Sequence, residues 1–319
     1  MVIPDTGSIE LKATSLTLDQ TLAETESLFI QTPTISTQVT TPSTHLYRTC
    51  PLQTLKDLAD SGDPIWSLHV TYLKDSTIIG LTFPHIMDAR GYQTLLTGLM
   101  QALADRPIPP LLSYDPWLKI LPEALKSSVQ VGAAWNVESI QEMQRDIVAD
   151  IEATGPMQTR IVYFPAEEVT RLKQKAMADI RKAGYTDVQW VSTSDVLSAW
   201  FYQHAFLDLP SDELATRFLC NIDSRKYFPE IFPSSYGYLQ NSFFTIATEP
   251  QFTVKQLHNM TFGEITRAIH LLVKSYALRK PLMGILKGFH EHQGDFYISF
   301  SPGGHLQGKD MLLTLSDNF

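Results

Sequence analysis

The stretch from Thr82 to Gly91 reads Thr-Phe-Pro-His-Ile-Met-Asp-Ala-Arg-Gly and decides the expected fold. It connects an uncharged, β-rich run to a segment in which apolar residues return at helical spacing, starting at Tyr92. The stretch therefore predicts a strand-to-helix junction with His85 at its turn. Because an imidazole is largely neutral at pH 7 and can accept a proton, His85 is a candidate general base. The spacing alone leaves open that His85 is a structural residue.

The same stretch resembles the His-x-x-x-Asp-Gly motif of the BAHD-type acyltransferases, a CoA-dependent family that includes fungal trichothecene acetyltransferases. Asp88 lies three residues after His85, whereas the family motif has four. Ala89 follows the aspartate, as it does in fungal members, and the glycine comes only at Gly91.

Three later segments occur in the order of the family's second half. Residues 192–199 resemble its Ser-Thr-x-Asp-x-x-x-Ala helix start, and residues 221–225 contain its Asp-x-Arg sequence. Residues 238–241 resemble its Tyr-x-Gly-Asn strand, with Gln240 in place of the glycine. The order and spacing of the motifs from the first stretch to Asn241 carry the resemblance.

The resemblance implies an α/β fold with two chloramphenicol-acetyltransferase-like domains. Each would be a mixed β-sheet with flanking helices, and an active-site channel would lie between them. On this basis we expect an N-terminal subdomain carrying the histidine at 1–105, a crossover linker at 106–157 and a C-terminal subdomain at 158–319.

The resemblance also implies roles for individual residues. His85 would deprotonate a hydroxyl or amine of a small-molecule acceptor, which then attacks the thioester of acyl-CoA. Asp88 would be architectural and would pair with Arg225 from the other half of the chain. From the residue alone, Asp88 is equally an acid favoured at a helix N-terminus. We further expect channel or substrate-binding roles for Ser192, Thr193, Tyr238 and Asn241.

A competing hypothesis is a relative that has lost productive geometry and acts as a small-molecule-binding or regulatory protein. The contracted spacing between His85 and Asp88 favours this alternative. For the enzyme, acyl-CoA would be a co-substrate, with no permanently bound cofactor.

Composition excludes several other classes. The chain has 319 residues, 44% hydrophobic and 18% charged, with a formal net charge of −9, which suits a globular protein of about two domains. Nucleic-acid binding needs a concentrated basic face, which the sequence lacks. Its two cysteines, Cys50 and Cys220, indicate neither a disulfide framework nor a zinc site. Without a leader or a membrane-length apolar run, we expect a cytoplasmic monomer that does not bind membranes.

Two further patterns are better explained by structure than by function. Residues 303–310 satisfy Gly-x-x-x-x-Gly-Lys, but Asp310 stands where a phosphate-binding loop needs a hydroxyl, and a strand-like run follows. His290 and His292 form an H-x-H pair in a polar stretch with no converging third ligand. We therefore expect residues 303–310 to form a turn between strands, and we expect no metal site at His290 and His292.

Periodicity predicts the remaining elements. Residues 1–45 are weakly patterned, with a short strand at 9–11 and a helix at 18–30 as candidates. We expect helices at 90–104, 166–183, 193–207, 261–276 and 282–290, and strands at 65–72, 77–83, 160–164, 218–223, 236–246, 296–300 and 311–315. Family members carry further strands before the start of this chain and an Asp-Phe-Gly-Trp-Gly motif after its end, so we expect a form truncated at both ends.

Overall fold

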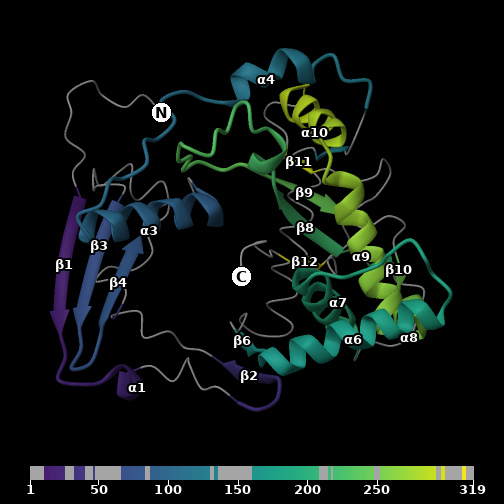
Figure 1. Cartoon of the computed structure of the whole chain (residues 1–319), viewed down its shortest axis with the longest axis horizontal. Coiled ribbons are helices and arrows are strands. Elements are labelled where there is room, and N and C mark those ends of the chain that lie inside the picture. The colour runs from purple at the N-terminus through teal and green to yellow at the C-terminus, as the bar shows by residue number, and fades with distance from the viewer. Residues whose placement is uncertain are drawn as a thin grey trace. The chain divides into compact units, whose positions relative to one another are not determined.

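A computed structural model of the chain describes residues 11–25, 32–39, 46, 66–82, 87–129, 133–135, 160–207, 215–216, 218–247, 252–291, 296–298 and 311–313 (Figure 1). His85 and the glycine-rich stretch at 303–310 lie outside these residues. The chain divides into two compact units: Met1–Ile86 with Gln158–Pro165, and Met87–Met157 with Ala166–Phe319.

The first unit is built on a three-stranded sheet. Its strands are β1 (Leu11–Thr17), β3 (Trp66–Tyr72) and β4 (Thr77–Thr82), in the order β1-β3-β4. The strands expected at 65–72 and 77–83 form an antiparallel hairpin, β3 with β4, and the Leu73 amide donates to Ser76 O across its turn. A separate antiparallel pair joins β2 (Ser36–Val39) to β6 (Arg160–Tyr163).

The weakly patterned N-terminus differs from the expectation. Strand β1 covers Leu11–Thr17 and lies parallel to β3, whereas only a short strand ending at residue 11 was expected. Among the described residues of the expected helix at 18–30, only Leu22–Thr25 (α1) are helical. A threonine- and serine-rich segment gives little local signal, and pairing with the distant strand β3 supplies the structure.

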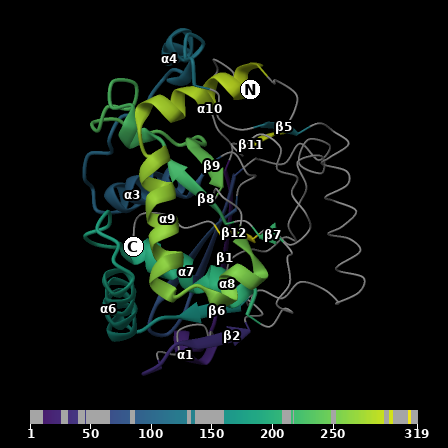
Figure 2. The same cartoon turned by 90° about the vertical axis from the view of Figure 1, so that its right-hand side faces the viewer.

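The second unit combines a central sheet with a layer of helices. The sheet order is β12-β8-β9, where β8 is Phe218–Asp223, β9 is Phe243–Ala247 and β12 is Met311–Leu313. Figure 2 shows α9 running between α10 and α8. The helices are α3 (Ala89–Leu103), α4 (Trp117–Ala124), α6 (Ala166–Lys182), α7 (Thr193–Ala205), α8 (Val254–Asn259), α9 (Phe262–Tyr276) and α10 (Arg279–Glu291). Two short antiparallel pairs join β7 (Ala215–Thr216) to β10 (Phe252–Thr253) and β5 (Ala133–Trp135) to β11 (Phe296–Ile298).

Apolar stripes at helical spacing form the core of the second unit. α9, expected at 261–276, buries Ile265, Ile269 and Leu272, while Tyr276 is half-buried. A capping box of Thr261 with Glu264 starts the helix. Gly263 allows a close approach to α6, because a Cβ there would lie 2.5 Å from the Ala176 carbonyl oxygen. The core-facing positions of α6 are Leu172, Ala176 and Ile180.

The expected strand at 236–246 begins later than predicted. Strand β9 starts at Phe243, which pairs with Asp223 of β8. Upstream, the backbone of Gly237 instead donates to Pro110 O at 2.8 Å and accepts from the Leu112 amide at 2.9 Å. The tertiary contact with 110–112 competes with the sheet ladder and keeps this segment irregular.

The compact units do not follow the residue limits of the expected subdomains. Helix α3 groups with the second unit, although it was expected in the N-terminal subdomain, and β6 groups with the first. The division at 105 and 157 therefore stays a prediction from family resemblance. Among the described residues, no helix is long and apolar enough to cross a membrane, and no three potential ligand residues cluster as a metal site would require.

Candidate active site around Asp88

The carboxylate of Asp88 lies at the start of α3 and accepts three hydrogen bonds. Its Oδ1 accepts from the Gly91 amide at 2.7 Å and from Arg225 Nη2 at 2.9 Å. Its Oδ2 accepts from the Ser242 amide at 2.7 Å. Asp88 is thus the N-cap of α3 and an ion-pair partner at the same time, so the two roles considered from the sequence are compatible.

Arg225 is the centre of the same cluster. Besides Asp88, its guanidinium donates to Asp223 Oδ1 at 2.9 Å and to Gln240 O at 2.7 Å. The Asp88 and Arg225 side chains are only 8% and 12% exposed, so their charges interact with little screening by water. Asp88 and Arg225 lie in the same compact unit, although the pairing was expected to join two halves of the chain.

Local features of the chain hold this cluster in place. Gly91 is required because a Cβ there would lie 2.0 Å from the Leu239 carbonyl oxygen, so only glycine lets α3 approach that backbone. Ser224 is buried, and its hydroxyl donates to Ser242 O at 2.8 Å. The end of β8 and the start of β9 are therefore tied together beside the N-terminus of α3.

We call Asp88, Asp223, Arg225, Gln240 and Ser242 the Asp88 cluster. The cluster brings together residues from three of the sequence motifs that carried the family resemblance, at 88, 223–225 and 238–241, and adds Ser242, which follows the last of them. The sequence did not single out the Ser242 amide, since a backbone donor leaves no side-chain signal.

Tyr238 lies next to the cluster with its ring centroid 5.5 Å from the Arg225 guanidinium carbon. Burial raises the pKa of Tyr238 to about 12, and the negative charge of Asp115 adds to this rise while Arg225 opposes it. The phenol therefore stays protonated at neutral pH. It donates to Gln240 Oε1 at 3.2 Å, so the side chain that replaces the family's glycine is itself held by the neighbouring tyrosine.

The other residues expected in the channel lie outside this cluster. Ser192 caps α7: its hydroxyl accepts from the Asp195 amide, and Asp195 Oδ2 accepts from the Ser192 amide at 2.7 Å. Thr193 is the first residue of α7 and is half-buried, and Asn241 is exposed. Among the described residues, no hydrogen bond joins Ser192, Thr193 or Asn241 to Asp88 or Arg225.

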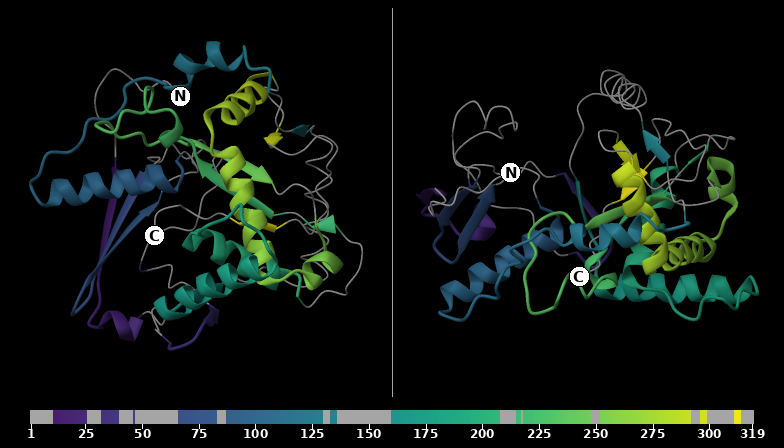
Figure 3. Two further views of the ribbon diagram at one scale, coloured as in Figure 1. Left: turned by 45° about the vertical axis from the view of Figure 1, so that its right-hand side comes forward. Right: turned by 90° about the horizontal axis from the view of Figure 1, so that it is seen from above.

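A cavity of about 1110 Å³ lies beside the Asp88 cluster. It is lined by α3, by residues 108–112 and by the loop that leads from Arg225 to Leu239. Figure 3 shows this loop close to α3 in both of its views. Tyr238 and Arg225 both contribute to the wall.

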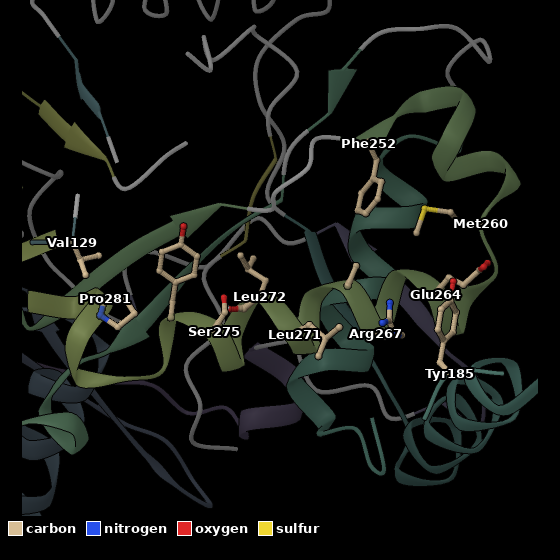
Figure 4. A pocket seen from close by; sticks show the side chains of 12 residues that line it. Val129, Tyr185, Phe252, Met260, Glu264, Arg267, Leu271, Leu272, Ser275 and Pro281 are labelled. Carbon is tan, nitrogen blue, oxygen red and sulfur yellow. The ribbon is translucent and has the colours of Figure 1, made fainter. Parts of the chain in front are cut away.

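A second cavity of about 720 Å³ follows one face of α9 (Figure 4). Arg267 lies on its wall, but its Nε donates to Asp187 Oδ1 at 2.8 Å and its guanidinium carbon is 4.0 Å from the Tyr185 ring centroid. The charge of Arg267 is therefore already engaged, and none of the residues expected to be functional lies here.

Known proteins that are similar to this chain in sequence include fungal acetyl- and acyltransferases. No family model matches the chain. O-acetyltransferase PaAT-2 of Phomopsis amygdali is 26% identical over 249 residues, covering 69% of this chain and 48% of the relative. O-acyltransferase ausP of Aspergillus calidoustus is 29% identical over 200 residues, covering 60% of this chain and 40% of the relative. Acetyltransferase BOT5 of Botryotinia fuckeliana is 23% identical over 253 residues, covering 73% of this chain and 46% of the relative. The chain spans about half the length of the curated relatives it matches.

Solved structures show the same fold. TRI101 of F. sporotrichioides, complexed with coenzyme A and T-2, matches with a TM-score of 0.54 and 16% identity, covering 98% of this chain and 66% of that one. TRI101 of F. graminearum, complexed with coenzyme A and T-2 mycotoxin, gives a TM-score of 0.51 and 13% identity, covering 95% and 65%.

The chain is similar in sequence to fungal O-acetyl- and O-acyltransferases and shares the fold of TRI101. The mixed α/β fold implied by its motifs is thereby confirmed. Within the BAHD-type pattern, this chain departs at the His85 to Asp88 spacing and at Gln240, and the Asp88 cluster forms in spite of both departures.

Proposed function

We propose that this chain transfers an acyl group from acyl-CoA to a hydroxyl or amine of a small-molecule acceptor, with His85 as the general base. The observation that carries the proposal is the Asp88 cluster, in which the aspartate of the first motif meets the arginine of a later one. The resemblance of the motifs to the BAHD-type pattern and the similarity to relatives named as O-acetyl- and O-acyltransferases support it.

In the proposed reaction His85 takes the proton of the acceptor hydroxyl as its oxygen bonds to the thioester carbonyl carbon. The carbon–sulfur bond then breaks, and the CoA thiolate leaves and recovers the proton. No acyl-enzyme is formed. Asp88 takes no part in proton transfer, because its oxygens already accept from Gly91, Ser242 and Arg225. It holds the start of α3 in place after the histidine.

Acetyl-CoA and a panel of primary and secondary alcohols test the proposal, with the free CoA thiol and the acetylated product both measured. His85→Ala should lower turnover by about 10² to 10⁴, the usual contribution of a general base. His204→Ala is the matched control, because His204 is exposed and its Nδ1 pairs with Trp200 O of its own helix. Turnover that survives in the His85 variant would remove His85 from the mechanism.

The alternative is a relative that binds a small molecule without transferring acyl groups. The contracted His85 to Asp88 spacing is the observation in its favour. Binding of CoA, measured by calorimetry, with no thiol release from any acceptor would support this alternative over the enzyme.

A further inference from the structure

The cavity along α9 has the size of a small-molecule site. Its volume of about 720 Å³ lies within the ~300–1,000 Å³ typical of ligand pockets. Its lining positions on α9 run from Glu264 to Tyr276 and recur every three or four residues, which places them on one face of the helix. Between these two residues the helix rises by about 18 Å at 1.5 Å per residue. Every described lining residue belongs to the second unit, and none belongs to the Asp88 cluster.

The middle of this wall is apolar and only partly covered. One stripe of α9, with Ile265 and Ile269, is buried in the core of the second unit. The face that lines the cavity carries Ala268 and Leu271, and both are half-buried. Phe252 of β10 is half-buried as well and lines the same cavity (Figure 4). Apolar side chains that stay partly exposed in a concave site are typical of binding surfaces.

Both charged side chains on the described wall have partners within the chain. Arg267 Nε donates to Asp187 Oδ1 at 2.8 Å, and its Nη2 donates to Asp187 Oδ2. Hydrogen bonding between them holds the pKa of Asp187 below its usual value and raises the pKa of Arg267, so both stay charged. Glu264 Oε2 accepts from the Thr261 amide at 2.8 Å and from the Thr261 hydroxyl at 2.9 Å.

These pairings decide what kind of ligand suits the cavity. Arg267 is the only basic residue among the described lining residues, and its charge is balanced by Asp187. A phosphate or carboxylate binds tightly where it meets an available cation or several donors, and the described wall offers neither at its apolar centre. The phosphate groups of CoA therefore find no partner here, whereas an uncharged molecule loses nothing by leaving water.

We propose that the cavity along α9 binds an uncharged, mainly apolar small molecule that is longer than it is wide. Its body lies along Ala268 and Leu271 and contacts Phe252. The ligand is distinct from acyl-CoA because of the charge pairing at the wall. The proposal goes beyond acyl transfer and does not depend on it, since binding is measured without turnover.

Filling the cavity tests the place of binding. N-Phenyl-1-naphthylamine is an uncharged probe that gains fluorescence in an apolar site. Ala268→Phe places a ring in the cavity and should weaken binding of the probe at least tenfold. Ser275 lines the cavity from an exposed position, so Ser275→Phe narrows the cavity with little effect on the core and should weaken the probe too. Unchanged circular dichroism and urea midpoints show which variants keep the fold.

Ala102→Phe is the matched control for these two variants. Ala102 is an exposed residue of α3 that lines the other cavity, beside the Asp88 cluster. Binding of the probe should be unchanged in this variant, and CoA at saturating concentration should not displace the probe from the unmodified chain.

A second probe tests the absence of an available charge. 1-Anilinonaphthalene-8-sulfonate has a similar shape and carries one negative charge, so it should bind the unmodified chain several-fold more weakly than the neutral probe. Asp187→Asn releases Arg267 and should raise the affinity for the sulfonate about two- to fivefold, the range expected for an exposed ion pair, with little change for the neutral probe. Glu168→Gln, which releases Arg171 on α6, is the matched control and should change neither affinity.

Three results would overturn the proposal. Unchanged binding of the neutral probe in folded Ala268→Phe or Ser275→Phe, or a loss confined to Ala102→Phe, would place the probe elsewhere. Displacement of the neutral probe by CoA would assign the cavity to the acyl donor. Equal affinity of the two probes for the unmodified chain, without a gain for the sulfonate in Asp187→Asn, would remove the preference for an uncharged ligand.

Discussion

Replacing Asp88 by alanine removes the acceptor of three hydrogen bonds at once. The loss of a helix N-cap costs about 1 kcal/mol, and an orphaned Ser242 amide costs about 1–3 kcal/mol. Arg225 keeps Asp223 and Gln240 O, so the buried guanidinium is not left without partners. Because these losses share one group they need not add fully, and we expect a total of about 2–4 kcal/mol.

Urea unfolding of Asp88→Ala, followed by circular dichroism, measures this loss, and equal m-values show that the two states are comparable. Asp88→Asn isolates the charge, because asparagine caps helices as well as aspartate does, and it should cost less than the alanine variant. Adding Arg225→Met to Asp88→Ala completes a double-mutant cycle. We expect a coupling energy of at least about 1 kcal/mol between the two positions.

The pair Arg171–Glu168 on α6 is the matched surface control, since Arg171 is 59% exposed. Arg171→Ala should cost no more than about 1 kcal/mol. The reasoning fails if Asp88→Ala costs no more than this surface variant, or if the cycle between positions 88 and 225 shows no coupling.

Three further predictions test the surroundings of the cluster and the cap of α7. Gly91→Ala should destabilise by about 2 kcal/mol or more in urea unfolding, because its Cβ overlaps a backbone carbonyl, while Gly98→Ala should be neutral or stabilising. The unfolded chain loses the Tyr238 proton near pH 10, whereas the folded chain keeps it to about pH 12, so the free energy of unfolding should fall as the pH rises through this interval. Tyr238→Phe should make this fall shallower when urea unfolding is measured from about pH 9 to 11.5. Asp195→Ala should cost about 2 kcal/mol by thermal or urea unfolding, because it removes the acceptor of the Ser192 amide and of His270 Nδ1.

Local sequence signals predicted the longer helices α3, α6, α7, α9 and α10 but not α4 or α8, and they predicted the sheets less well. The capping boxes at Ser192 and Thr261 and the positive-φ Gly184 mark helix ends by chemistry within a few residues, which a sequence shows directly. The order β12-β8-β9 and the parallel pairing of β1 with β3 depend on residues far apart in the chain. Nothing in the local pattern of the β1 segment specifies its distant partner.

In the candidate site, too, some residues could be named from the sequence and others could not. Family resemblance named Asp88 and Arg225, whose side-chain atoms lie 2.9 Å apart. The resemblance could not supply Gly91 as the point of close approach to Leu239, or Ser242 as a backbone donor, because both depend on where two backbones meet in space. The irregular path of 236–242, expected to be a strand, is what presents the Gln240 carbonyl and the Ser242 amide to the cluster.

The aspartate end of the contracted first motif is engaged through both carboxylate oxygens. A carboxylate has about four lone-pair positions, and Asp88 uses three of them for donors fixed by a helix turn, a buried arginine and the start of a strand. Such an aspartate is poorly placed to relay a proton, and its position is set by contacts that do not involve the histidine. The removal of one residue between His85 and Asp88 has therefore left the architectural half of the motif intact. Whether the chain is an enzyme or a binding protein then depends on the histidine half, and the His85→Ala comparison with acetyl-CoA distinguishes the two.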